Sequence, residues 1–156
     1  MSKSGLDEGT SIFDPTLCEM DYIWFTKQGD TILDPFAGGA VRGIVAAKMG
    51  RNYVGIDLRQ EQIDANVEQG NSILGNDEII PIWYCGDSTN VKDIVGHHAP
   101  FDHLFTCPPY GDLEVYSDNP RDISNMEADD FDATYIDILG KSCSLLEDNR
   151  FATVVI

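Results

Sequence analysis

Short apolar runs and helix-like segments alternate along most of the chain. β-Branched and aromatic residues concentrate in five short stretches, which predicts buried strands over 31–36, 53–58, 79–85, 102–107 and 151–156. After each of the first two stretches, apolar residues return at helical spacing, over 41–49 and 60–69. A glycine follows each segment, so we predict two helices that end at Gly50 and Gly70.

Two further helices are predicted, one before the first strand and one before the last. Over residues 13–25, Asp14 can cap a helix and Pro15 suits its first turn. Strands that alternate with helices predict an α/β fold, with a mostly parallel sheet and helices on both faces. Residues 111–130 have no strong period and are predicted to form a functional or mobile loop. The last helix is marked by Phe131, Tyr135, Ile138, Leu139 and Leu146.

The composition is that of one globular domain. The chain has 156 residues, which is enough to bury a core without stabilising cross-links such as disulfides or bound metals. No apolar run approaches the roughly 20 residues that span a bilayer, and the polar N-terminus lacks a signal core. The four cysteines are scattered, which argues against a disulfide framework or a zinc knuckle. We therefore expect reduced thiols and a cytoplasmic location.

The net charge limits the choice of partner. Ten basic residues against 27 acidic ones give a formal charge of −17. A chain this acidic should repel a phosphate backbone unless its few cations cluster. Composition alone therefore argues against nucleic-acid binding, in conflict with the motifs below.

Polar clusters follow the predicted strands at their carboxyl ends, where parallel sheets bind ligands. The first is DPFAGGA, residues 34–40, whose glycines allow close backbone approach and whose helix N-terminus offers N–H groups to an anion. The alternative is a tight turn. Asp57 ends the second strand and could accept both hydroxyls of a ribose, or it could only cap the next helix.

Two more clusters end the third and fourth strands. In Gly86-Asp87-Ser88, Asp87 could accept a hydrogen bond from an adenine amino group and also cap the helix near Asn90. In residues 106–110, TCPPY, the two prolines end the strand and leave carbonyl groups free. Tyr110 then offers a flat face for a planar ring. The alternative is a proline-rich turn with a core tyrosine.

In this order, DPFAGG, GIDL, CGDS and TCPPY resemble the motifs of the S-adenosylmethionine-dependent DNA amino-methyltransferases, which modify cytosine N4 or adenine N6. The resemblance implies the Rossmann-like methyltransferase fold, one domain over residues 1–156, S-adenosylmethionine as cofactor and DNA as partner. It also implies cofactor contacts from Phe13, Asp34, Phe36, Ala37, Gly38, Gly39, Asp57, Leu58, Gly86, Asp87 and Ser88.

The resemblance assigns catalysis to Cys107, Pro108, Pro109 and Tyr110. Cys107 and the Pro108 carbonyl would accept N–H groups of the target amine, and Tyr110 would hold the base outside the helix stack. Two positions depart from the family pattern: Ala40 replaces a glycine, and Cys107 is a weak acceptor. Thr106 cannot substitute, because neighbouring strand residues point to opposite faces. Since cysteine resembles serine in shape, cytosine N4 is slightly favoured over adenine N6.

Other functions stay open from the sequence. One is a cofactor-binding module without DNA activity, and another is methylation of RNA, protein or a small molecule. No residues have metal-ligand spacing, and the three histidines are predicted to lie in solvated loops. The resemblance also implies two strands beyond residues 151–156. We therefore expect the chain to be incomplete at its C-terminus, with an exposed edge that allows self-association and a basic DNA-reading region elsewhere.

Overall fold

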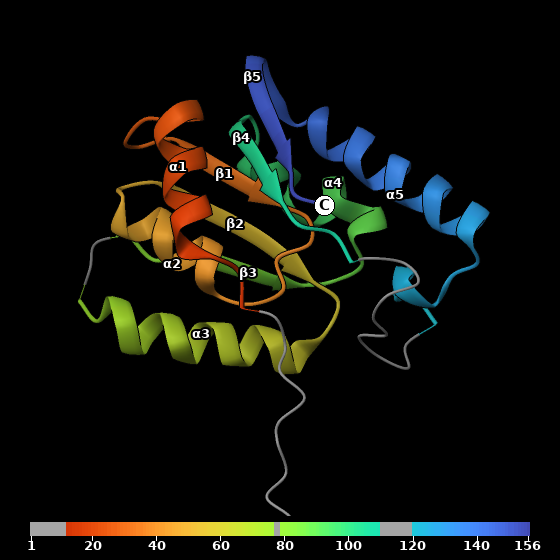
Figure 1. Ribbon diagram of the computed structural model, residues 1–156, viewed down its shortest axis with the longest axis horizontal. Coiled ribbons are helices and arrows are strands. Elements are labelled where there is room, and N and C mark those ends of the chain that lie inside the picture. The colour runs from red at the N-terminus through yellow and green to blue at the C-terminus, as the bar shows by residue number, and fades with distance from the viewer. Residues whose placement is uncertain (1–11, 77–78, 110–119) are drawn as a thin grey trace, which may run out of the picture.

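A computed structural model describes residues 12–76, 79–109 and 120–156. It forms one five-stranded sheet in the order β3-β2-β1-β4-β5, in which every pair of neighbours is parallel (Figure 1). The strands are β1 (Thr31–Asp34), β2 (Asn52–Asp57), β3 (Ile82–Cys85), β4 (Phe101–Thr106) and β5 (Leu146–Val154). The helices are α1 (Pro15–Phe25), α2 (Val41–Lys48), α3 (Gln60–Leu74), α4 (Val91–Val95) and α5 (Ala128–Cys143), with short 3-10 turns at Ser88–Asn90, Gly96–His98 and Ile123–Asn125.

The sheet is covered on both faces. Helices α1, α2 and α3 pack on one face and α4 and α5 on the other (Figure 1). Alternate strand residues point to opposite faces, so Ile32 and Tyr53 join the first core while Leu33 and Val54 join the second. The predicted α/β fold, with a parallel sheet and helices on both faces, is confirmed by this arrangement.

The strand order reverses at β1, which positions the site. From β1 the chain moves outward through β2 to β3, then returns to place β4 on the other side of β1. The helices that follow β1 and β4 therefore leave in opposite directions and open a crevice at the carboxyl ends of the two strands. The DPFAGGA and TCPPY motifs follow these two strands.

The local signals for α1 and α2 are confirmed. The Asp14 carboxylate accepts the N–H of Thr16 at 2.8 Å, and Pro15 occupies the first turn of α1. Helix α2 ends before Gly50, whose φ of +79° only glycine adopts easily. Among the described residues, no helix is long and apolar enough to cross a membrane.

Several element boundaries were predicted wrongly, most clearly those of α3, α5 and β5. Helix α3 continues through Gly70 to Leu74, because Gly70 lets the helix lie against Trp83: a Cβ there would meet two ring atoms at 3.3 Å. Leu146 starts β5 rather than extending α5. Strand β5 therefore begins well before the predicted range 151–156.

The prediction of a solvated loop is wrong for His103. It lies on β4 and is fully buried. Its Nδ1 lies 2.8 Å from the Phe151 carbonyl oxygen and its Nε2 lies 2.6 Å from Oδ2 of Asp21. Because a carbonyl oxygen only accepts, Nδ1 must donate to Phe151, and Nε2 faces the Asp21 carboxylate. His103 thereby ties α1 to β4 and β5.

Candidate functional site

The turn after β1 is held by backbone and side-chain hydrogen bonds. Ala37 N–H donates to the Ile56 carbonyl at 2.9 Å, and the Asn66 amide donates to the Gly38 carbonyl at 2.7 Å. Gly38 has a φ of +51°, which favours glycine. Its N–H donates to Oδ2 of Asp57 at 3.2 Å. The glycine turn is thus fixed against β2 before any ligand arrives.

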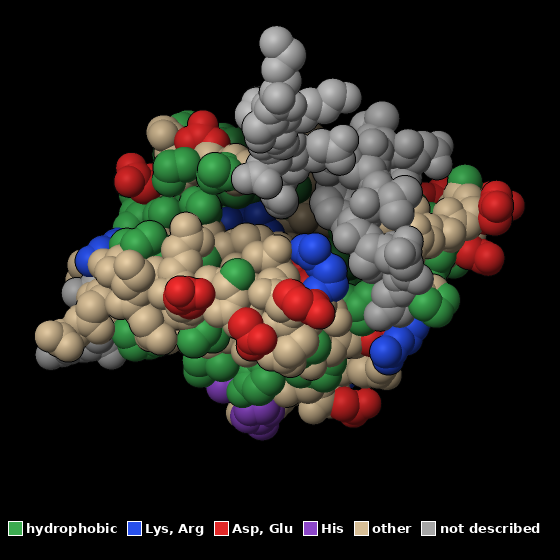
Figure 2. Space-filling model, turned by 90° about the horizontal axis from the view of Figure 1, so that it is seen from below, with side chains coloured by type: hydrophobic (Ala, Val, Ile, Leu, Met, Phe, Trp, Pro, Cys, Tyr) green, Lys and Arg blue, Asp and Glu red, His purple; other side chains and the backbone are tan. Residues whose placement is uncertain are grey.

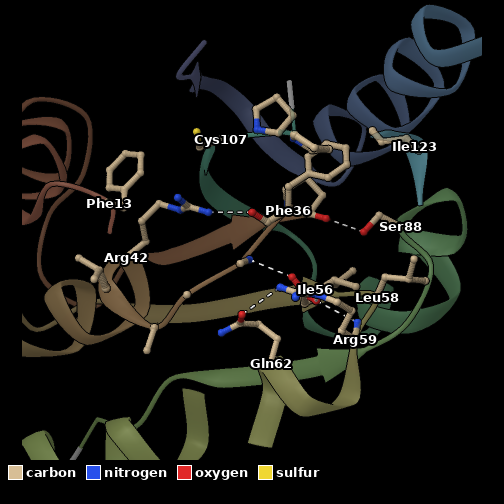
Figure 3. A pocket seen from close by; sticks show the side chains of 18 of the residues that line it. Phe13, Phe36, Arg42, Ile56, Leu58, Arg59, Gln62, Ser88, Cys107 and Ile123 are labelled. Atoms are coloured by element: carbon tan, nitrogen blue, oxygen red, sulfur yellow. Dashed lines mark hydrogen bonds and ion pairs between the residues drawn. The ribbon is translucent and has the colours of Figure 1, made fainter. Parts of the chain in front are cut away.

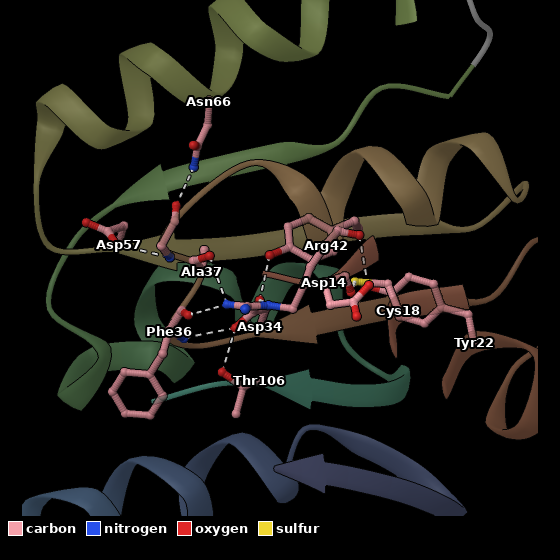
Figure 4. Close-up of polar contacts among 12 residues, drawn as sticks. Asp14, Cys18, Tyr22, Asp34, Phe36, Ala37, Arg42, Asp57, Asn66 and Thr106 are labelled. Carbon is pink, nitrogen blue, oxygen red and sulfur yellow. Dashed lines mark hydrogen bonds and ion pairs between the residues drawn. The ribbon is translucent and has the colours of Figure 1, made fainter. Parts of the chain in front are cut away.

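Asp34 is the centre of a buried network beneath this turn (Figure 4). Its Oδ1 accepts the Thr106 hydroxyl at 2.6 Å and the Phe36 N–H at 3.1 Å. Its Oδ2 accepts the Tyr53 hydroxyl and Nε of Arg42, each at 2.6 Å. Four hydrogen bonds use the carboxylate fully, so Asp34 holds the turn from below instead of facing a ligand.

Arg42 carries the positive charge of the network. Its Nη2 donates to the carbonyl oxygens of Phe36 and Ala37 at 2.7 and 2.9 Å. Burial lowers the pKa of Arg42, but the Asp34 charge outweighs this effect and holds the pKa above its usual value. The guanidinium is therefore charged at every working pH, and it clamps both the carboxylate and the turn.

A cavity of about 600 Å³ opens at the carboxyl ends of the strands. Phe13 and Arg42 lie at one end of it, and Leu58 and Arg59 at the other (Figure 3). The structure brings most of the predicted site residues to its wall: Phe13, Phe36, Gly38, Gly39, Asp57, Leu58, Gly86, Asp87, Ser88, Cys107, Pro108 and Pro109. Asp34 and Ala37 lie buried beneath the turn, and Tyr110 lies outside the described residues.

Asp57 faces the cavity from the end of β2. Its Oδ1 accepts the Arg59 N–H at 2.9 Å, while Oδ2 accepts the Gly38 N–H. Burial raises the pKa of Asp57, and these N–H groups and the Arg59 charge lower it only in part, so the pKa stays above its ordinary value. Each oxygen keeps room for one more donor, which matches the two hydroxyls of a ribose.

The turn after β3 forms the floor near Leu58. The Ser88 hydroxyl donates to the Pro35 carbonyl at 2.5 Å, which joins this turn to the one after β1. The Asp87 Oδ1 accepts the N–H and the hydroxyl of Thr89, so it caps the Ser88–Asn90 turn as predicted. This carboxylate lines the cavity as well.

The turn after β4 closes the cavity from above. Cys107 is half-buried, and Pro108 and Pro109 follow it along the wall. The Thr106 hydroxyl points instead to Asp34. Phe36 stacks on Tyr135 of α5 with ring centroids 6.3 Å apart, and burial together with Cys107 raises the pKa of the Tyr135 phenol. An apolar, aromatic wall therefore lies beside the thiol.

Sequence reasoning missed several cavity residues: Arg42, Arg59, Gln62, Arg121 and Ile123. The first three immediately follow recognised motifs in α2 and at the start of α3, and this proximity could have indicated them. Figure 2 shows basic side chains at the hollow of this face, with acidic side chains on the surface around them. Arg42, Arg59 and Arg121 therefore line the cavity together with four aspartates, Asp14, Asp57, Asp87 and Asp122.

Comparison with known proteins supports the family resemblance over one segment. The DNA methylase family matches residues 24–68. Type II methyltransferase M2.DpnII of Streptococcus pneumoniae is 50% identical over 38 residues, 24% of this chain and 14% of that protein. M.Cfr9I of Citrobacter freundii is 44% identical over 52 residues, 33% of this chain and 16% of that protein. The resemblance to the DNA amino-methyltransferases is confirmed over this short stretch, which spans a small part of the relatives' length.

Solved structures match nearly the whole chain in fold. A putative rRNA-methylase from Clostridium thermocellum has a TM-score of 0.65 at 20% identity, over 94% of this chain and 74% of that one. The putative methyltransferase SMU.1697c from Streptococcus mutans, in complex with SAH, has a TM-score of 0.59 at 13% identity, over 92% and 73%. The chain therefore has the fold of S-adenosylmethionine-dependent methyltransferases.

Proposed function

We propose that this chain binds S-adenosylmethionine in the cavity and transfers its methyl group to an exocyclic amino group of a DNA base. One observation carries the proposal: a single cavity is lined by the glycine turn, by Asp57 and by the Cys107-Pro108-Pro109 turn. These groups follow three different strands, β1, β2 and β4. The family match over residues 24–68 favours DNA as the substrate class.

The cofactor would lie along the carboxyl ends of β1 to β4. Asp57 would accept the ribose hydroxyls, and Leu58 and Asp87 would contact the adenine. The methionine end would lie at the glycine turn near Phe13. A cavity of about 600 Å³ falls within the range typical of cofactor sites.

When bound, S-adenosylmethionine supplies a methyl group activated by its sulfonium sulfur. The carbonyl oxygen of Pro108 and the thiol of Cys107 would accept the N–H groups of the target amine. They would thereby turn its lone pair out of the ring toward the methyl group. The nitrogen gains the methyl group and loses one proton to water, while the electron pair of the broken S–C bond stays on the sulfur of the departing S-adenosylhomocysteine. Tyr110 would hold the base, while Phe36 and Tyr135 keep water away from this side.

Cytosine N4 is the target we favour over adenine N6. The support is the shape of the residue before the prolines, since cysteine resembles serine. A hydroxyl or carboxylate accepts a hydrogen bond better than a thiol does, so Cys107 should limit the rate. The same weakness favours a second candidate, a cofactor-binding module without transfer activity of its own.

Methyl-transfer assays separate these functions. We would incubate the chain with methyl-labelled S-adenosylmethionine and duplex DNA, single-stranded DNA, RNA or free nucleosides. Cys107→Ser should raise transfer to DNA by roughly two- to tenfold, the effect of about one neutral hydrogen bond. Cys143→Ser, at an exposed cysteine of α5, is the matched control and should change nothing.

Each outcome has a distinct meaning. Label on DNA, raised by Cys107→Ser, supports the proposal, and digestion to nucleosides identifies the base. Label on RNA alone would show that the chain transfers methyl groups but that its substrate is RNA, which would refute DNA as the substrate class. Cofactor binding with no transfer by either protein supports the module without activity and refutes the enzymatic proposal.

A further inference from the structure

We propose that the buried guanidinium of Arg42 binds the carboxylate of the cofactor's methionine end and makes the site selective for that group. This inference rests on the proposed function, because it assigns a residue to one group of the same cofactor. Neither the motifs nor the comparisons give Arg42 a role. Its position at the end of the cavity that holds Phe13 suggests one (Figure 3).

Arg42 is held in place from three sides. Nε is bound by Asp34, Nη2 is bound by two carbonyl oxygens of the glycine turn, and the ring centroid of Phe13 lies 4.6 Å from Cζ. Only 4% of the residue is exposed. A guanidinium fixed in this way loses little further entropy when it binds a ligand.

Nη1, the third nitrogen of the Arg42 guanidinium, can donate to a ligand in the cavity. Within the part of the chain that the structure describes, no acceptor is recorded for Nη1, although Arg42 lines the cavity wall. A guanidinium carries five N–H donors, and the recorded bonds use Nε and Nη2. Charged donors in a partly desolvated site bind a carboxylate more strongly than neutral donors do.

The surroundings fit an amino-acid zwitterion. The first turn of α2 begins at Val41, so its free N–H groups also favour an anion here. Asp14 lines the same cavity and places one carboxylate there, which suits an α-ammonium group. Arg59, at the opposite end, lies 3.7 Å from Asp57 and belongs to the adenosine side.

Decarboxylated S-adenosylmethionine provides the test, because it lacks the carboxylate and keeps the ammonium, the sulfonium and the adenosine. We would measure the affinity of the intact chain for both compounds by titration calorimetry. We expect wild type to prefer S-adenosylmethionine by roughly tenfold or more, as for a hydrogen-bonded ion pair. Equal affinities would overturn the inference without any variant. No binding of either compound would instead refute the proposed function, and the inference with it.

Variants locate the selectivity. Arg42→Lys keeps the charge and should keep part of the preference. Arg42→Gln is combined with Asp34→Asn, because Arg42→Gln alone would leave a buried carboxylate unpaired. In this double variant the preference for S-adenosylmethionine over its decarboxylated form should fall below about threefold. Arg59→Gln should weaken the binding of both compounds to the same extent, so the ratio of their two affinities should not change. A structural clamp alone would lower both affinities equally in the Arg42 variants, and that result would refute our assignment.

Discussion

Replacing Asp57 tests the cofactor site most directly. In Asp57→Ala the ribose would lose two acceptors, and the N–H groups of Gly38 and Arg59 would lose theirs. A hydrogen bond to a charged group contributes about 1.5–3 kcal/mol net. The Asp57 side chain is 13% exposed, so water can replace part of what is lost. We therefore expect a total loss of about 2–3 kcal/mol, or roughly 30- to 150-fold in cofactor affinity.

Asp57→Asn is the finer perturbation. The amide keeps one acceptor oxygen without the charge, so the loss should be about half, roughly five- to tenfold. Burial raises the pKa of Asp57 in the folded chain, so its ionised form costs stability at neutral pH. We expect Asp57→Asn to melt at the same temperature as wild type or higher. A weaker cofactor complex in a protein that is no less stable excludes misfolding as the cause.

The pH dependence has a definite sign. The ribose hydroxyls need an acceptor, so binding uses the ionised carboxylate. The pKa of Asp57 lies above the ordinary 3.8. As the pH is lowered, the cofactor affinity should therefore begin to fall at a higher pH than it would with an aspartate of ordinary pKa. Asp57→Asn should abolish this dependence.

Titration calorimetry from pH 8 down to the acid limit of folding measures both effects. Asp64→Ala, which removes the same charge from the exposed face of α3, is the control and should match wild type. If Asp57→Ala binds S-adenosylmethionine within twofold of wild type, the ribose assignment is wrong.

Three further predictions concern the support of the site. Gly55→Ala would place a Cβ 2.9 Å from that of Ala37, so it should destabilise the fold by about 1–3 kcal/mol in urea unfolding and weaken cofactor binding. Burial raises the pKa of the Cys18 thiol to about 12, so iodoacetamide at pH 8 should leave it unmodified in mass spectrometry of the native protein. His103→Phe should cost about 3–5 kcal/mol, because it leaves Asp21 charged and buried, and adding Asp21→Leu should restore most of the loss in thermal unfolding.

The sequence predicted the elements well where the signal was local. Asp14 caps α1, and Gly50 ends α2, because a side-chain oxygen and a positive φ act within a few residues. Gly70 has the same appearance in the sequence as Gly50, yet α3 runs through it. The reason is its contact with Trp83 on the neighbouring strand, which no local pattern reveals.

Long-range polar pairs could not be predicted. His103 and Asp21 lie 82 positions apart, and each alone suggests a solvated residue. Asp34 was expected to contact the cofactor as part of its motif. In the structure, donors from α2, β2 and β4 occupy it, and only the assembled sheet brings them together.

The grouping of the cavity residues was predictable for a different reason. Parallel strands align their carboxyl ends, so motifs that follow such strands must meet at one edge whatever the order of the strands. The strand order then decides where the crevice opens. For this reason, Asp57 and Cys107 line one cavity although they are 50 positions apart.

The charge that argued against nucleic acid is unevenly distributed. Three of the ten basic side chains, Arg42, Arg59 and Arg121, line the cavity. Acidic side chains such as Asp129 and Asp130 are exposed on the outer surface of α5. Four aspartates, Asp14, Asp57, Asp87 and Asp122, line the same cavity, so its lining carries both signs. The acidic exterior weakens attraction to a phosphate backbone. A net charge of −17 thus opposes non-specific adsorption along DNA, and a phosphate near the cavity would have to be bound by individual arginines such as Arg59 and Arg121.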